Sequence, residues 1–176
     1  MTTVLLDKGV IRRAYERQIR LIRGLTPTCA QDASTLILAQ MLTSGFQGYV
    51  TKEISHVLMS RSPTIGSVLL KGIRVLEKGK YLRRWARRLR NFGFTAEDAV
   101  ILSHGTFGVD CTARTLGVSI IVTTDLGMIE NYRRHLDSIH TKLRDMRENL
   151  SAPYCYVELP EILSVAEMHH RIIRVQ

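Results

Sequence analysis

The sequence predicts an α/β fold, with a central, mainly parallel β-sheet between two layers of helices in a three-layer α/β/α arrangement. Strand-like and helix-like segments alternate along the chain, which is typical of a parallel sheet. Two short apolar runs, at 4–6 and 118–122, have the composition of strands that are buried on both faces. A chain of 176 residues is long enough for one domain with a full core.

Glycine, proline and threonine mark the ends of the elements in the first half of the chain. Gly24 closes the first helix, and Thr26, Pro27 and Thr28 begin the second, because proline suits a first helical turn and threonine can cap one. The expected elements are a strand at 4–6, a helix at 10–23, a helix from about 28 to Gly45, a strand at 48–51, a helix at 52–59 and a mostly helical stretch at 64–89.

The second half begins with a helix that carries a capping signal. Thr95 is expected to cap this helix, since Asp98 stands at the third position after it, as in a capping box. Gly105 and Gly108 should end or bend the helix, and an inserted turn is expected around 108–110. The remaining elements are a strand at 118–122, a helix at about 126–149, a strand at 154–157 and a helix at 160–173.

The charge of the chain favours a polyanionic partner. Its 25 lysines and arginines outnumber its 16 acidic residues, which gives a formal net charge of +9. This balance favours nucleic acid or an acidic protein as the partner, and we expect no membrane partner. The alternative is a soluble protein that is merely basic.

Basic residues gather in two expected helices. The segment 80–90 contains six cations and two aromatic residues, and an apolar stripe at helical spacing places Trp85 in the core. Its arginines then project elsewhere, where they can follow phosphates, as can those of the helix at 10–23. Either set has the alternative of a solvated surface. The candidates for nucleic-acid binding are Arg12, Arg13, Arg83, Arg84, Arg87 and Arg88.

Several patterns bear on the compartment. No apolar run approaches the roughly 18 residues that a membrane-spanning helix needs, and the amino terminus lacks the pattern of a signal peptide. The three cysteines lie far apart in sequence and are interpreted as small core residues in a reducing compartment. We therefore expect a cytoplasmic protein.

Three aspartates stand where strands are expected to end or helices to begin. Asp7 follows the first strand, Asp98 lies in a helical first turn, and Asp125 follows the strand at 118–122. Ligands of open parallel sheets bind at the carboxyl ends of the strands. Carboxylates gathered there repel one another unless a cation lies between them or one is protonated, and Mg²⁺ or Mn²⁺ prefers such oxygen ligands.

Three short motifs follow one another along the chain: a strand-like run ending in Asp7 at 4–7, a helix-like segment with Asp98 at 94–102, and a late strand-like run ending in Asp125 at 117–125. Their order resembles the PIN-domain family, whose members include many metal-dependent ribonucleases. The first motif resembles the family's first strand and aspartate, the second the helix with the central aspartate, and the third the late strand. The resemblance implies a PIN-like fold over residues 1–176 with an extra C-terminal strand and helix. It also implies Asp7, Asp98 and Asp125 as catalytic metal ligands, and a Thr123 hydroxyl that orients a ligand or water.

The chain departs from the family pattern at the usual glutamate of the helix after the second strand. Counting from Thr51 reaches His56, and the nearest acid is Glu53, one turn earlier. Three interpretations stay open: Glu53 substitutes, His56 is a neutral ligand, or the site is weakened. Lys8, directly after Asp7, can also compete with a metal ion.

Each acid also has a purely structural interpretation. Asp98 suits a helical first turn because the helix dipole favours an acid there, and Asp7 and Asp125 can be N-caps. Glu53 and His56 can equally be ordinary surface residues of their helix. These interpretations need no metal and no catalysis.

The leading hypothesis is a ribonuclease that hydrolyses RNA phosphodiester bonds with Mg²⁺ or Mn²⁺. Membership of the toxin ribonucleases would imply an antitoxin-like protein as partner, and a homodimer is also compatible with the sequence. The alternative is a catalytically weakened PIN-like module that binds RNA or protein without turnover. A third hypothesis is a protein-interaction subunit whose arginines meet an acidic partner.

Overall fold

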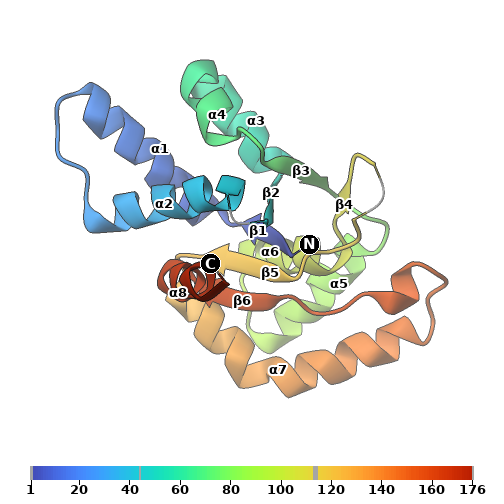
Figure 1. Ribbon diagram of the computed structural model, residues 1–176. Helices are drawn as coiled ribbons and strands as arrows, with labels where there is room; N and C mark the ends of the chain where they lie inside the picture. The colour runs from blue at the N-terminus through green and yellow to red at the C-terminus, as the bar shows by residue number, and fades with distance from the viewer. Residues whose placement is uncertain (1, 44, 113–114, 176) are drawn as a thin grey trace.

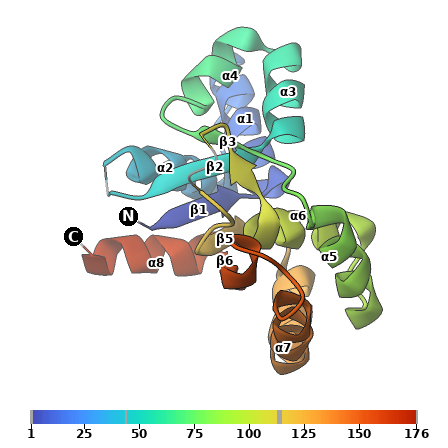
Figure 2. The ribbon, with the colours of Figure 1, turned by 90° about the vertical axis from the view of Figure 1, so that its right-hand side faces the viewer.

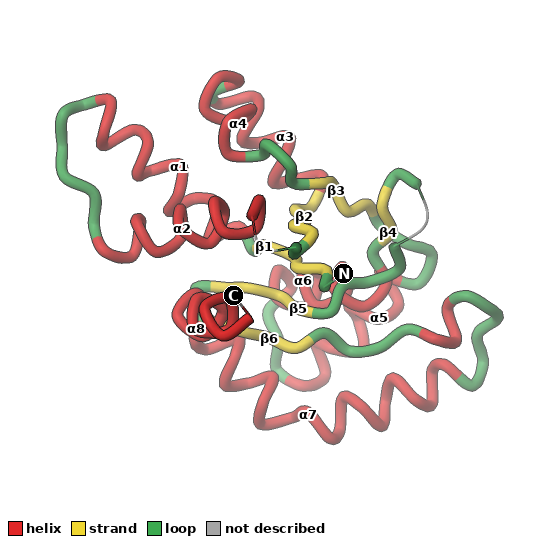
Figure 3. The backbone as a smooth tube through the Cα atoms, in the orientation of Figure 1, coloured by secondary structure: helices red, strands yellow, loops and turns green. Residues whose placement is uncertain are grey.

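The structure is a computed structural model that describes residues 2–43, 45–112 and 115–175 (Figures 1 and 3). A six-stranded sheet with the order β4-β3-β2-β1-β5-β6 forms its centre. All neighbouring strands run parallel except β3 and β4, which confirms the expected α/β class and the mainly parallel sheet. The strands are β1 (Thr3–Leu6), β2 (Gln47–Thr51), β3 (Arg74–Glu77), β4 (Val109–Asp110), β5 (Ile120–Thr123) and β6 (Glu161–Ser164).

Helices pack against both faces of this sheet (Figures 1 and 2). The core of one face includes residues of the fifth to seventh helices, and the core of the other includes residues of the first four and the last. The helices are α1 (Lys8–Ile22), α2 (Cys29–Thr43), α3 (Lys52–Arg61), α4 (Pro63–Leu69), α5 (Leu82–Leu89), α6 (Ala96–Phe107), α7 (Leu126–Arg147) and α8 (Val165–Val175).

The strand β1 shows how the sequence builds both cores. Successive side chains of a strand point to opposite faces. Leu5 accordingly lies in the core formed with α5, α6 and α7, whereas Val4 and Leu6 lie in the core formed with α1, α2 and α8. All three side chains are fully buried, so the apolar run at 4–6 belongs to a strand covered on both faces.

The expectation of a mostly helical stretch at 64–89 is wrong in its middle. Residues 74–77 form β3, which pairs with β2 and β4. Only Leu76 is fully buried in this strand, so it lacks the apolar run that identifies β1 and β5. The turn expected around 108–110 lies slightly later, because Val109–Asp110 pairs with β3 as β4 and the turn follows at 111–112.

The expected C-terminal strand is wrong in position. Residues 154–156 form a short 3₁₀ helix, η2 (Tyr154–Tyr156), and the strand β6 lies at 161–164, where a helix was expected. Aromatic residues favour strands, but Tyr156 is 72% exposed. The last helix therefore begins at Val165 instead of at 160.

Two further expectations concern single residues. Trp85 is fully buried, which confirms its expected place in the core. The interpretation of the cysteines as core residues is wrong, because Cys29 and Cys111 are exposed and Cys155 is half-buried. Across the part of the chain that the structure describes, no helix combines the length and the apolar character that crossing a bilayer requires.

Candidate functional site

Asp7 lies where β1 ends and α1 begins. It is the N-cap of α1, and its Oδ1 accepts a hydrogen bond from the backbone N–H of Lys8 at 2.6 Å. Its Oδ2 accepts one from the Thr123 hydroxyl at 2.8 Å. Thr123 is the last residue of β5, which pairs in parallel with β1, so the two strands end side by side. The sequence-based expectation that Asp7 and Thr123 belong to one site is consistent with this geometry.

The surroundings of the Asp7 carboxyl group disfavour its charged form. Burial raises its pKa above the ordinary aspartate value, and the negative charge of Glu97 raises it further. Hydrogen bonds from Thr123, Lys8 and Gly9 lower the pKa but do not cancel the effect of burial. A carboxylate that is shielded from water near a second acid is more stable with a proton or a cation beside it.

Gly9 permits the close approach of α1 to the turn after β5. A Cβ atom at this position would lie 2.2 Å from the Oγ1 atom of Thr124, which is far inside contact distance. Glycine therefore lets the first turn of α1 pack against the turn that carries Asp125.

Asp125 joins Asp7 through Thr123. The backbone N–H of Asp125 donates to the Thr123 hydroxyl oxygen at 3.1 Å, and that hydroxyl donates to Asp7. Thr123 is fully buried, so its orientation is fixed. Asp125 is exposed and caps α7 through its Oδ1, which accepts from the N–H of Met128 at 2.9 Å. The structure thus links three of the expected site residues.

Asp98 lies in the first turn of α6, within a capping box. Its Oδ2 accepts hydrogen bonds from the Thr95 hydroxyl at 2.7 Å and from the Thr95 N–H at 3.3 Å. Its own N–H donates to the Thr95 hydroxyl at 3.1 Å. The expected capping box is confirmed. It accounts for Asp98 structurally while engaging one carboxylate oxygen.

Glu97 is the acid of α6 whose charge acts on Asp7. It pairs with the ammonium group of Lys8, the residue next to Asp7. Sequence reasoning missed Glu97, although it directly precedes the expected ligand Asp98. Lys8, which was expected to compete with a metal ion, is the ion-pair partner of Glu97.

The donor set suits a hard divalent cation in its chemistry. Asp7, Glu97, Asp98 and Asp125 offer only oxygen, as Mg²⁺ and Mn²⁺ prefer. Capping engages Oδ2 of Asp98 and Oδ1 of Asp125, which leaves the second oxygen of each outside these hydrogen bonds. As the side chains stand, no three acidic, histidine or cysteine residues within the described ranges are grouped tightly enough to hold an ion. The carboxylates would therefore have to draw together on binding.

Glu53 and His56 lie on α3, away from the Asp7 hydrogen bonds. Glu53 is in the first turn and pairs with the Lys78 ammonium at 2.5 Å, and this contact lowers its pKa. His56 is exposed one turn later. No hydrogen bond or ion pair between described residues links either of them to Asp7.

A buried histidine lies within range of the charges of Glu53 and Lys78. His104 of α6 is fully buried, and neither ring nitrogen has a hydrogen-bond partner among the described residues. Burial lowers its pKa from 6.5 to about 4, and the charges of Glu53 and Lys78 add smaller, opposing effects. The sequence offers no signal for this cluster, because tertiary contacts alone bring its members together.

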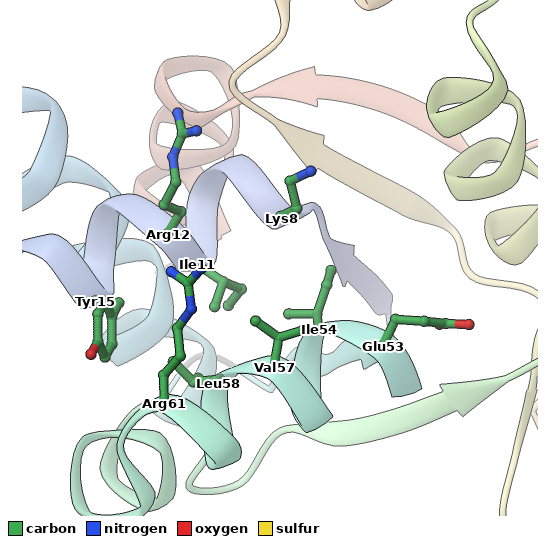
Figure 4. Close-up of a pocket in the computed structure, with 9 residues that line it drawn as sticks. All are labelled: Lys8, Ile11, Arg12, Tyr15, Glu53, Ile54, Val57, Leu58 and Arg61. Carbon is green, nitrogen blue, oxygen red and sulfur yellow. The ribbon is translucent and has the colours of Figure 1, made fainter.

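A groove between α1 and α3 opens beside Lys8 (Figure 4). It holds about 400 Å³, and its wall is mainly apolar. Figure 4 shows Lys8 and Glu53 near one end and Tyr15 and Arg61 near the other. Its lining is Lys8, Ile11, Arg12, Tyr15, Glu53, Ile54, Val57, Leu58 and Arg61.

The six arginines expected to bind nucleic acid occupy two helices. Arg12 and Arg13 lie on α1, where Arg12 is 3.6 Å from the carboxylate of Glu16. The other four lie on α5, two of them along a groove between α5 and α6 and two outside it. The first two are Arg83 and Arg87, and the others are Arg84 and Arg88.

Comparisons of the chain with models of protein families, with curated proteins and with solved structures find no match. Any functional conclusion therefore depends on the geometry of the site.

Proposed function

We propose that the chain is a PIN-like ribonuclease that hydrolyses RNA phosphodiester bonds with a Mg²⁺ or Mn²⁺ ion held by Asp7, Asp98 and Asp125. The observation that carries this proposal is the half-buried carboxylate of Asp7, bonded to Thr123 at the adjoining ends of β1 and β5, with a raised pKa. The basic character of the chain supports a polyanionic substrate. The parallel strand order β3-β2-β1-β5-β6 is compatible with the fold that the resemblance implies.

The residues at this site would have separate roles in the reaction. A bound divalent ion would lower the pKa of a coordinated water and stabilise charge on the scissile phosphate. Thr123 fixes the orientation of the Asp7 carboxylate by donating to its Oδ2 atom. Lys8 holds Glu97 and so partly offsets the negative charge that faces Asp7.

Glu97 is the residue that best fills the place of the missing glutamate. Its charge acts on Asp7, whereas Glu53 is engaged by Lys78 and His56 is exposed. We expect Glu97, together with Asp7, to set the affinity for the ion. Lys8 would compete with the ion for Glu97, since both are cations.

The test combines calorimetric titration with Mn²⁺ and cleavage of single-stranded RNA. The wild-type chain should bind Mn²⁺ and cleave, and Asp7→Asn or Asp125→Asn should abolish both. Asp32→Asn is the control, because Asp32 pairs with Arg17 on the surface of α2 and α1, outside the site. Cleavage that persists in EDTA, or full activity in both site variants, would refute the proposal.

A binding module without turnover is the second candidate. The observation that favours it is that lysines already pair with Glu97 and Glu53, so two of the acids have a counterion without any metal. This candidate expects salt-sensitive RNA binding and intact RNA after incubation with Mg²⁺ or Mn²⁺. Reproducible, metal-dependent product would exclude it.

A toxin role is the narrower form of the first candidate. An acidic, amphipathic segment of an antitoxin-like protein would suit the groove between α1 and α3, because Lys8, Arg12 and Arg61 stand against the single acid Glu53 in its lining. Expression of the wild-type chain should arrest cell growth, and expression of Asp7→Asn should not. Equal growth of the two strains would exclude the toxin role without touching the nuclease activity.

A further inference from the structure

The groove between α5 and α6 is lined by cations without any acid. Lys78, Arg83, Arg87 and Arg90 line it, and it holds about 540 Å³. At this groove a negatively charged chain would therefore meet four positive side chains at once.

Most of these charges are not neutralised by the protein. Arg83, Arg87 and Arg90 are exposed and take part in none of the ion pairs of the described residues. Lys78 pairs with Glu53. Three unpaired guanidinium groups along one groove attract phosphates more strongly than a surface where each cation faces an acid.

The buried side of α5 fixes the direction of these arginines. Leu82, Trp85, Ala86 and Leu89 are all buried in the core, so the helix cannot rotate without exposing them. Arg83 and Arg87 are four residues apart and thus project from the same side. At 1.5 Å per residue, the positions from 83 to 90 extend over about 10 Å, which is enough for two or three phosphates of one strand.

The groove adjoins the candidate metal site. Its second wall is the start of α6, where Ala96 and Ala99 line the groove and Glu97 and Asp98 lie between them in sequence. A strand bound along α5 would therefore pass the acidic first turn of α6.

We propose that this groove binds the backbone of single-stranded RNA and leads it to the carboxylates. The nature of the ligand rests on the proposed function, and the charges alone indicate a polyanion. The single strand is favoured because the α6 wall of the groove carries the exposed apolar side chains of Ala96 and Val100. Unpaired bases can contact such a wall, whereas a duplex hides its base faces.

The experiment measures the salt dependence of binding to a short fluorescent, single-stranded oligoribonucleotide in EDTA. For single strands, the slope of log K against log salt changes by about 0.7 for each phosphate contact. The double variant Arg83→Gln/Arg87→Gln should therefore lose about 1.4 of the wild-type slope. Arg90→Gln alone should lose about 0.7 and serves if the double variant misfolds.

The matched control removes the same charge from the same helix. Arg84 and Arg88 lie outside the groove, so Arg84→Gln/Arg88→Gln should change the slope by less than half as much. Equal losses in both double variants would overturn the groove in favour of the general charge of α5. Tighter binding of duplex RNA, or no RNA binding by the wild-type chain at low salt, would overturn it as well.

Failure of this inference can be told apart from failure of the proposed function. If the wild-type chain cleaves RNA with metal but its salt slope does not depend on Arg83 and Arg87, the nuclease proposal holds and this groove is excluded. If the salt slope falls as expected in the variants but no cleavage occurs in Mn²⁺, the groove binds RNA in a protein that does not cut it.

Discussion

Asp7, at the end of β1, and Asp98, at the start of α6, are both aspartates, but the protein surrounds their carboxyl groups differently. Asp7 lies near Glu97, and its pKa is raised because burial and this charge together exceed its hydrogen bonds. Asp98 is half-buried in a complete capping box with Thr95. A third acid, Glu167, accepts hydrogen bonds from Ser164 and Arg133, which lower its pKa to about 2.

The difference teaches which acid calls for a functional explanation. Capping stabilises a helix by about 1 kcal/mol, and this gain explains the position of Asp98 without any ligand. Asp7 also caps a helix, but it does so while its charged form is disfavoured. A residue that opposes stability where the strands end is the stronger candidate for chemistry.

The largest expected effect is that of Asp7→Asn on activity. The rate of RNA cleavage should fall roughly 1,000-fold, because the variant removes a charged ligand of the ion. Without metal at pH 7, the free energy of unfolding should stay unchanged or rise. The sign follows from the raised pKa: the proton on Asp7 stabilises the fold at low pH, and this stabilisation is lost as pH rises through the folded pKa. Thermal melts and cleavage rates provide the measurement.

Two results would break the contrast at Asp7. A large loss of stability in Asp7→Asn would show that the carboxylate mainly supports the fold. Mn²⁺ at 100 times its dissociation constant should stabilise the wild-type chain by about 2.7 kcal/mol, and equal stabilisation of Asp7→Asn would place the ion elsewhere.

The second effect concerns His104, whose two ring nitrogens have no hydrogen-bond partner among the described residues. Its folded pKa is about 4 against 6.5 when unfolded, so the unfolded chain binds the proton first as pH falls. The wild-type free energy of unfolding should therefore drop by roughly 3 kcal/mol between pH 6.5 and 4, relative to His104→Leu. His140→Leu, which removes an exposed histidine, should retain the wild-type dependence. Denaturant melts across this pH range measure the difference, and parallel curves for wild type and His104→Leu would contradict it.

The elements that the sequence predicted well are those with a strong local signal. The strands β1 and β5 are buried on both faces, so their apolar composition located them. The helix α6 was located by the spacing of its capping box. The strand β3 has one fully buried residue, and β4 has two residues in all, which leaves no pattern to detect. The strand β6 was missed because α8 follows it directly, without a glycine or proline between them.

The same limit applies to the site. Strand ends are predictable, so the residue pattern alone could place Asp7, Thr123 and Asp125 together. It could not place Glu97 with them, because its partner Lys8 is 89 positions away and the contact depends on how α6 packs below the sheet. His104 depends in the same way on the positions of Glu53 and Lys78.

The smallest expected change in stability, that of Asp98→Asn, tests the other half of the contrast. Asparagine can still accept the hydrogen bond from Thr95 but loses the charge that the helix N-terminus favours, so we expect a loss of about 0.5 kcal/mol in the free energy of unfolding. The control Asp98→Ala removes both hydrogen bonds that the Asp98 carboxylate accepts in the capping box and should cost about 1 kcal/mol. Denaturant melts at pH 7 without metal resolve the two.

The sign of the change in the free energy of unfolding is decisive, since Asp7→Asn is expected to leave stability unchanged or raise it. If Asp98→Asn also raised stability, the carboxylate of Asp98 would destabilise the fold as that of Asp7 does, and the capping box would not explain the position of Asp98. Under the proposed function, Asp98→Asn should also abolish Mn²⁺ binding, so that one carboxylate serves both the helix and the ion.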